Sequence, residues 1–155
     1  MQEISLKESL FPAQSSSPVW EISIGEKLRE MTALNPAAPA LVEVTVEGVT
    51  ERRWTYGELL ADAEQLAEAL STRFAPGERV VVWAHNIPEW VLMEYACALS
   101  GLVLVTANPA FQPKELRYVL EQSGAVALFL VESYRGNPMA EIGRLCDHVR
   151  AINED

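Results

Sequence analysis

The amino-acid sequence predicts an α/β fold: a mainly parallel sheet with helices on both faces, plus a β-hairpin near the N-terminus. Three observations predict this class. Three short apolar runs in the second half lack polar alternation, which is typical of strands buried on both faces. Helical patterns separate these runs, as in βαβ units. An alternating segment before them turns back after a glycine, which indicates a hairpin.

The N-terminal part is expected to hold a tail and one short helix. Residues 1–18 predict a flexible tail, because they include a Gln-Ser-Ser-Ser-Pro stretch and sustain no period. The α/β subdomain is then expected over residues 19–155. Ser23 and Glu26 have the spacing of a capping box, which predicts a helix start. The dipeptide Asn35-Pro36 ends this helix.

A hairpin and the clearest helix follow. Residues 41–47 alternate, and a return run after Gly48 passes through Trp54, so the hairpin is expected to add an antiparallel edge to the sheet. Thr55 and Glu58 form a second capping box. The helix that they open carries one apolar stripe, made of Leu59, Ala63, Leu66 and Leu70.

Strands and helices alternate from residue 79 onward. Buried strands are expected over residues 79–84, 102–106 and 126–131. Helices are expected from Pro88 to Ser100, from Pro113 to Gly124 and from Met139 to Cys146. The prolines suit the first helical position, and glycines 101 and 124 suit the position just after a helix.

The C-terminus suggests an interrupted domain. A further strand is expected to begin at His148 and to run to Ile152, close to the last residue, Asp155. Because a parallel sheet buries both faces, a domain rarely stops where a new strand begins. We therefore expect truncation, with the missing C-terminal part of the same polypeptide as a partner. Open sheet edges invite association, so the isolated chain is expected to self-associate.

Charge and composition exclude several classes. A net charge of −10 disfavours a nucleic-acid partner and a polybasic membrane contact. No apolar run reaches the length of a membrane span, and the N-terminus lacks a secretory pattern, so a cytoplasmic location is expected. Cys97 and Cys146 have no ligand-type spacing and are expected to be free thiols.

Familiar phosphate-binding and catalytic patterns are absent from the sequence. The eight glycines form no GxGxxG or GxxxxGK loop. Neither GxSxG nor HExxH occurs. We accordingly assign no catalytic residue and no metal ligand, and we expect no cofactor to bind this chain alone.

His85 is expected at the carboxyl end of a strand, the edge at which α/β sheets bind ligands. With Glu89 four residues later, it could form an acid–base or metal-binding pair. The alternative is a loop histidine beside a helix start. In that case Asn86 supplies the cap, and the helix dipole favours Glu89.

The segment Asn108-Pro109-Ala110-Phe111 forms the next loop at the same sheet edge. It could line a ligand channel with backbone groups and an aromatic wall. Alternatively, the asparagine and proline only build a turn, and Phe111 fills the core.

Five segments, in this order, resemble the core motifs of adenylate-forming acyl-CoA synthetases of the fatty-acyl and aryl-CoA ligase type. They are Trp54-Thr55-Tyr56-Gly57-Glu58-Leu59, Pro76-Gly77-Glu78-Arg79-Val80, Asn86-Ile87-Pro88-Glu89-Trp90, Leu99-Ser100-Gly101-Leu102-Val103-Leu104-Val105 and Asn108-Pro109. Each motif alone is weak, whereas the ordered set, within residues 22–131, is specific.

The resemblance implies the first part of the large N-terminal domain of an AMP-forming acid–thiol ligase. Such enzymes use ATP and Mg²⁺ to convert a carboxylate into an acyl-adenylate and then transfer the acyl group to coenzyme A. Their phosphate loop, adenine and ribose sites and catalytic lysine would lie beyond Asp155. The resemblance also implies that the loop after the second core motif borders the pantetheine channel, which makes Asn108, Pro109 and Ala110 candidate neighbours of coenzyme A.

The sequence thus predicts an N-terminal fragment of an ATP-dependent acyl-CoA synthetase, inactive by itself, whose parent acts on a carboxylic acid, with fatty acids favoured. The alternative is a stand-alone, non-catalytic binding or interaction module on the same scaffold. A reading frame that continues into a Ser/Thr/Gly-rich phosphate loop would favour the first reading, and a stop codon the second.

Overall fold

The computed structural model describes residues 19–45 and 47–146. Its helices are α1 (Ile24–Leu34), α2 (Tyr56–Ser71), α3 (Pro88–Ser100), α4 (Pro113–Ser123) and α5 (Met139–Arg144). Its strands are β1 (Pro39–Val44), β2 (Thr50–Thr55), β3 (Arg79–Trp83), β4 (Val103–Ala107) and β5 (Ala127–Leu130). The predicted tail over 1–18 and the predicted strand from His148 to Ile152 lie outside the described residues.

The predicted α/β class is confirmed by a three-stranded parallel sheet. Its strand order is β4-β3-β5, and β3 runs parallel to both neighbours. Val81 in the middle of β3 is aligned with Val105 on one side and with Leu128 on the other. Helix α3 connects β3 to β4, and α4 connects β4 to β5, as parallel strands require a crossover.

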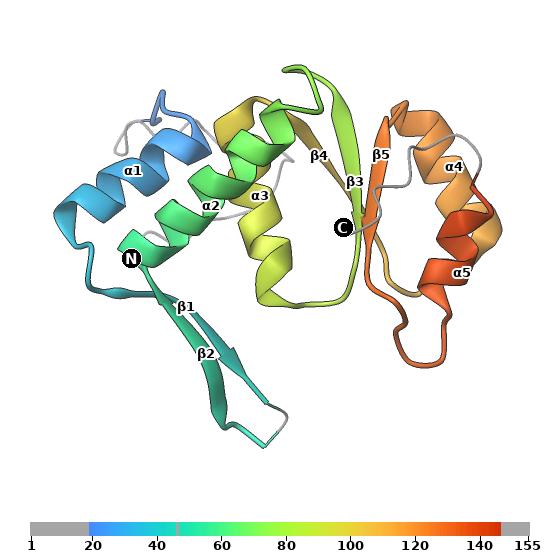
Figure 1. The fold of residues 1–155 in the computed structure, drawn as a ribbon, viewed down its shortest axis with the longest axis horizontal. Helices are drawn as coiled ribbons and strands as arrows, with labels where there is room; N and C mark the ends of the chain where they lie inside the picture. Colours follow the sequence, from blue (N-terminus) through green and yellow to red (C-terminus); the bar gives the residue numbers. More distant parts are fainter. Residues whose placement is uncertain (1–18, 46, 147–155) are drawn as a thin grey trace, which may run out of the picture.

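Helices cover both faces of this sheet, as predicted, and form two layers around β3 (Figure 1). Successive strand side chains point to opposite faces. Val80 and Val82 therefore lie in a core with α2 and α3, whereas Val81 and Trp83 lie in a second core with α4 and α5. The four side chains from Val80 to Trp83 are 0–3% exposed, so β3 is the structural centre of the molecule.

The two outer strands are less buried than the sequence pattern predicts. In β4 only Ala107 is buried, and in β5 only Ala127. Val103 keeps 45% of its surface exposed. The reason is that β4 and β5 each pair only with β3 within the described part of the chain, and the two cores are centred on β3.

The predicted hairpin is confirmed, but its predicted position at the edge of the sheet is wrong. Strands β1 and β2 pair with each other in an antiparallel sheet of their own. The hairpin projects away from the rest of the molecule (Figure 1). Its base is fixed at the start of α2, where the amides of Tyr56 and Gly57 donate to the carbonyls of Ala38 and Pro36. These bonds hold the hairpin beside the helical layer, away from the sheet edge.

Local sequence signals explain where most elements begin and end. Both predicted capping boxes form, at Ser23 with Glu26 and at Thr55 with Glu58. Gly101 ends α3 with φ at +74°, a conformation that favours glycine. The predicted cap at Asn86 is wrong, because the N-cap of α3 is Ile87, without a side-chain bond. Pro88 takes the first helical position and keeps the residue before it extended.

Candidate functional site

The loops that follow the three parallel strands meet at one edge of the sheet. Parallel strands end at the same edge, which is where ligands bind in open α/β folds. The loop after β3 carries His85, the loop after β4 carries Asn108, and the loop after β5 carries Tyr134 and Asn137. This carboxyl edge is the candidate site that the structure assembles.

The loop from Asn108 to Phe111 is a compact turn with an exposed surface. The Ala110 amide donates to Oδ1 of Asn108 at 2.9 Å, and the Phe111 amide donates to the Asn108 carbonyl at 2.9 Å. Asn108 and Ala110 are exposed, Pro109 is half-buried, and Phe111 packs against the core of α4 and α5. The turn interpretation is therefore confirmed, while a channel role for Asn108, Pro109 and Ala110 stays a prediction.

Two side chains from neighbouring elements hold this loop. The indole Nε1 of Trp83, at the end of β3, donates to the Asn108 carbonyl at 2.7 Å. The amide Nδ2 of Asn137 donates to the carbonyls of Pro109 and Phe111 at 3.1 and 3.2 Å. Sequence reasoning placed Trp83 only within the buried strand expected over residues 79–84 and did not single out Asn137, because bonds that span 25 to 28 positions leave no local pattern.

Asn137 closes a tight turn after β5. The amides of Tyr134 and Asn137 donate to each other's carbonyls at 3.1 and 2.9 Å. Between them Arg135 and Gly136 have φ of +47° and +80°, the pattern of a type I′ turn. The left-handed conformation costs a residue with a side chain about 1–2 kcal/mol, so the surrounding contacts must hold Arg135 in place. The Tyr-Arg-Gly-Asn sequence could have indicated this turn.

Ring contacts fix the same turn against the loop after β3. The His85 and Tyr134 rings stack with centroids 4.8 Å apart and planes 14° apart. The Arg135 guanidinium lies 5.2 Å from the centroid of the Tyr134 ring. The Nδ1 atom of His85 is buried and lacks a hydrogen-bond partner. His85 thus acts here as a packing surface for Tyr134.

The structure pairs Glu89 with an arginine and not with His85. Arg52 of β2 binds both Glu89 and Glu43, which joins the hairpin to the start of α3. The Arg52 side-chain hydrogen bond holds the pKa of the Glu89 carboxyl below its ordinary value, against the effect of burial. A carboxylate that stays ionised beside a fixed cation is poorly suited to exchange protons, so the acid–base pair considered for His85 and Glu89 is not assembled.

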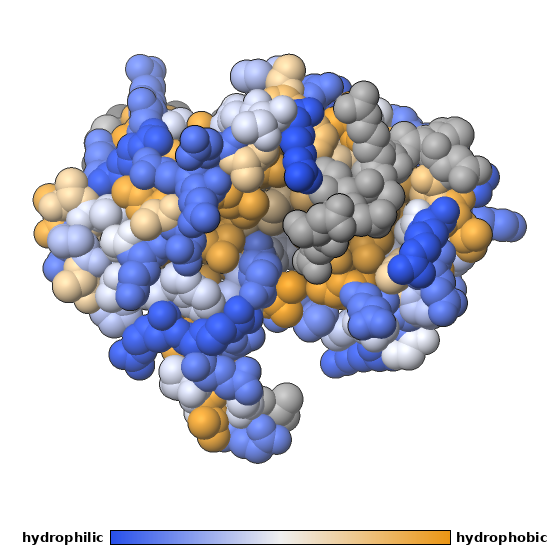
Figure 2. All heavy atoms as spheres, in the orientation of Figure 1, coloured by the Kyte–Doolittle hydropathy of each residue, from blue (hydrophilic) through white to orange (hydrophobic). Residues whose placement is uncertain are grey.

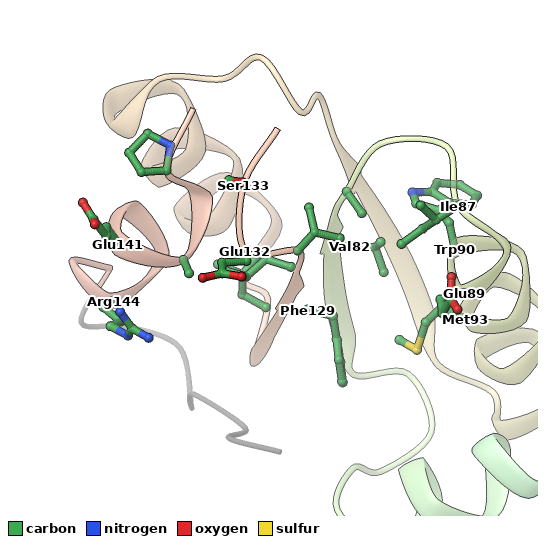
Figure 3. A pocket seen from close by; sticks show the side chains of 16 residues that line it. Val82, Ile87, Glu89, Trp90, Met93, Phe129, Glu132, Ser133, Glu141 and Arg144 are labelled. Atoms are coloured by element: carbon green, nitrogen blue, oxygen red, sulfur yellow. The ribbon is translucent and has the colours of Figure 1, made fainter. Parts of the chain in front are cut away.

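A groove of about 910 Å³ opens beside the candidate site, between α3 and the segment that follows β5. Its floor is apolar and its sides carry Glu89, Glu132, Glu141 and Arg144 (Figure 3). Phe129 of β5 and Met93 of α3 both border it. Figure 2 shows apolar surface near the middle of the molecule, between the two helical layers. The groove therefore combines an apolar floor with a mostly acidic rim.

The described residues provide no cluster of three or more metal-ligand side chains, and none of their helices is long and apolar enough to cross a membrane. Cys97 and Cys146 are not joined by a disulfide. Burial raises the pKa of the Cys97 thiol to about 11, which leaves it protonated at neutral pH.

Comparison with known proteins gives a consistent set of relatives. Over 114 residues the chain is 36% identical to the medium-chain acyl-CoA ligase ACSF2 of Pongo abelii, covering 73% of this chain and 18% of that protein. Its fold matches the acetoacetyl-CoA synthetase from Streptomyces lividans with a TM-score of 0.74 and 27% identity, covering 84% of this chain and 21% of that one. A Mycobacterium tuberculosis fatty acyl CoA synthetase matches with a TM-score of 0.69 and 26% identity, covering 83% and 25%.

The chain thus spans about a fifth of the length of the relatives that it matches. The sequence profile of the family described as AMP-binding enzyme matches residues 28–153, which is most of the chain. The described elements from α2 to α5 all lie within this match. The fold, the ordered motifs and the family match agree, and the chain belongs to the AMP-binding enzyme family.

Proposed function

We propose that this chain is the N-terminal part of an ATP-dependent acyl-CoA ligase. The ligase converts a carboxylic acid and ATP into an acyl-adenylate and pyrophosphate, and then transfers the acyl group to the thiol of coenzyme A with release of AMP. The observation that carries the proposal is the family match over residues 28–153, together with a relative named as an acyl-CoA ligase at 36% identity.

The described residues fit only a part of such an enzyme. ATP and Mg²⁺ need a phosphate-binding loop and hard oxygen ligands. The described residues hold no cluster of three metal-ligand side chains, and the sequence has no glycine-rich phosphate loop. In the proposal, ATP and Mg²⁺ bind polypeptide outside this chain, and the scaffold described here supports that polypeptide. ATP supplies the adenylate leaving group, and Mg²⁺ neutralises phosphate charge.

The loop at Asn108, Pro109 and Ala110 is proposed to border the path of the pantetheine arm. Two features support this proposal. The loop follows a parallel strand at the carboxyl edge, where ligands bind in such sheets. It also exposes Asn108 and Ala110, while the Trp83 indole donates a hydrogen bond to its backbone at the Asn108 carbonyl. A mainly apolar arm with amide groups suits such a wall of small residues and backbone groups.

Fatty acids are the proposed substrate class. The relatives that support this choice are named as a medium-chain acyl-CoA ligase and a fatty acyl CoA synthetase. The cytoplasmic location expected from the sequence stays a prediction, because the first of these relatives is named as mitochondrial. Self-association of the isolated chain also stays a prediction, supported by the outer edges of β4 and β5, which bear no partner strand in the described residues.

ATP–pyrophosphate exchange tests the proposal. We expect no exchange from this chain alone and fatty-acid-dependent exchange from the full-length polypeptide encoded with it. When coenzyme A is added, the full-length polypeptide should also form the acyl thioester, which is measured as the loss of free thiol on coenzyme A. A full-length polypeptide that folds but exchanges no pyrophosphate with fatty or aryl acids would contradict the proposal and favour a non-catalytic module. Exchange by this chain alone would show that the scaffold already holds a complete site.

A further inference from the structure

One of the two side chains that hold the loop at the candidate site comes from the turn after β5. Asn137 donates both of its amide hydrogens to the loop, one to the Pro109 carbonyl and one to the Phe111 carbonyl. The two acceptors lie on either side of Ala110. The Asn137 side chain is half-buried in this arrangement. One planar amide therefore fixes the spacing of two carbonyls in the loop.

We propose that Asn137 is a positioning residue for the coenzyme A step of the ligase. It sets the conformation of the loop from Asn108 to Phe111, and the loop in turn borders the pantetheine path. This inference rests on the proposed function. It adds to that function a residue that touches neither the substrate nor the reacting atoms and acts through the loop that it holds.

The chemistry of the contact explains why an asparagine is needed. A primary amide offers two N–H donors in a fixed plane, which no hydroxyl or carboxylate of similar size can match. The loop keeps its Asx turn through Asn108 and Ala110 without help from Asn137. Asn137 adds two hydrogen bonds that connect this turn to the segment after β5. When these two bonds are lost, the loop can stay folded and still shift its position.

The turn that carries Asn137 is itself held in a strained shape. Arg135 has a φ of +47°, and mutual hydrogen bonds between Tyr134 and Asn137 close the turn around it. The stacked ring of His85 supports Tyr134 from the loop after β3. Strained backbone of this kind concentrates at functional sites, where the surrounding structure holds it in place. The strand-end loops of β3, β4 and β5 are thereby linked into one unit.

Kinetics of the full-length polypeptide with Asn137→Ala and Asn137→Asp test this role. The two hydrogen bonds hold the loop and not coenzyme A itself, so their loss reaches the affinity only through the displaced loop, and we expect the KM for coenzyme A to rise roughly tenfold in Asn137→Ala. The rate of ATP–pyrophosphate exchange should stay at the wild-type value, because adenylation does not use the pantetheine path. At neutral pH Asn137→Asp should be worse than alanine, because a carboxylate would face two carbonyl oxygens.

The aspartate variant adds a pH profile that a purely structural role would not produce. A protonated carboxyl has one O–H donor, so lowering the pH should bring the KM of Asn137→Asp for coenzyme A back toward the wild-type value. The KM of Asn137→Ala should not recover in this way. The matched control is Thr32→Val, which removes a side-chain donor to the Tyr56 carbonyl at 3.2 Å, far from the loop. Its KM for coenzyme A should not change.

Each other outcome contradicts the proposal in a recognisable way. An unchanged KM for coenzyme A in both variants, with normal exchange, overturns the role of Asn137 and leaves the proposed function standing. Equal losses of ATP–pyrophosphate exchange and of thioester formation assign Asn137 to stability alone. The same conclusion follows if Asn137→Ala fails to fold and the KM of Asn137→Asp for coenzyme A does not recover at low pH. A wild-type polypeptide without any exchange overturns the proposed function, and this inference with it.

Discussion

Strand β3 and the β1–β2 hairpin are both short β structure, but they are stabilised in opposite ways. The side chains from Val80 to Trp83 are almost completely buried between two helical layers. The hairpin leaves Val42, Val44 and Val49 40–61% exposed and projects from the body of the molecule (Figure 1). Burial of one such side chain contributes about 1.5–3 kcal/mol, so β3 depends on packing much more than the hairpin does.

Charge and backbone bonds replace packing in the hairpin. Arg52 joins Glu43 on the neighbouring strand to Glu89 at the start of α3. The Arg52 guanidinium also lies 5.4 Å from the centroid of the Trp54 ring, whose Nε1 donates to Asp62 of α2 at 2.9 Å. Interactions between exposed charges are weak and sensitive to salt and pH. The stability of the parallel sheet should therefore depend on the volume of its buried side chains, and that of the hairpin on pH and salt.

The largest effect is expected from removing volume beside β3. Leu116 of α4 is 0% exposed and packs in the same core as Val81 and Trp83. Leu116→Ala should lower the free energy of unfolding by about 2–5 kcal/mol, because it removes buried methyl groups and leaves a cavity. Urea unfolding measures this change. Val103→Ala, at a position 45% exposed on β4, is the control and should cost about 0.5 kcal/mol. Equal costs would show that the core is not centred on β3.

An intermediate effect is expected where α3 turns into β4. Gly101 has a φ of +74°, and a Cβ at this position would meet the Cβ of Pro76 at 3.3 Å. Gly101→Ala should therefore lower the free energy of unfolding by about 1–2 kcal/mol through backbone strain, with a further cost from the contact.

Gly124 supplies the matched control for this turn. Its φ is +63°, but a Cβ there would meet nothing within 4 Å. Gly124→Ala should consequently show the strain without the contact and cost less than Gly101→Ala in the same urea titration. Identical losses would mean that Pro76 moves freely and that the turn after α3 is not tightly packed.

Local patterns in the sequence predicted the elements well, because the information lies within a few residues. The pairs Ser23 with Glu26 and Thr55 with Glu58 predicted two helix starts, and both capping boxes form. Gly101 predicted the end of α3. Apolar runs without alternation predicted three parallel strands, although they overstated the burial of the outer two. Burial depends on neighbours that a local pattern does not contain.

Contacts between distant segments could not be predicted from such patterns. The bond from Asn137 to the Pro109 carbonyl spans 28 positions, and that from Arg52 to Glu89 spans 37. Alternation showed that β1 pairs with β2, but it did not show that the pair stands apart from the main sheet. The candidate site was predicted as a loop at Asn108 and completed only when the fold brought Trp83 and Asn137 to it.

The smallest effect, and the one that depends on conditions, is expected in the hairpin. Arg52 lowers the pKa of Glu89 from the ordinary 4.5 in the folded state. A lowered carboxyl pKa contributes stability that is present above the unfolded-state value and is lost as the pH falls through the folded-state value. Arg52→Gln should therefore lower the Tm slightly at pH 7. The difference in Tm between this variant and wild type should become smaller below pH 4.5, as Glu89 is protonated.

Salt should also reduce the difference in Tm between wild type and Arg52→Gln, because both ion pairs of Arg52 are partly exposed. The screening length is about 8 Å at 0.15 M salt and shorter at higher salt. Arg53→Gln is the matched control, since it removes the same charge from an exposed neighbour on β2. Thermal unfolding from pH 7 to pH 3, at low and high salt, compares the two variants. If both lose the same stability at every pH and salt concentration, net charge and not the Arg52 bridge accounts for the effect. The hairpin would then be held to the body by its other contacts with α2, namely the backbone bonds to the carbonyls of Ala38 and Pro36 and the bond from Trp54 to Asp62.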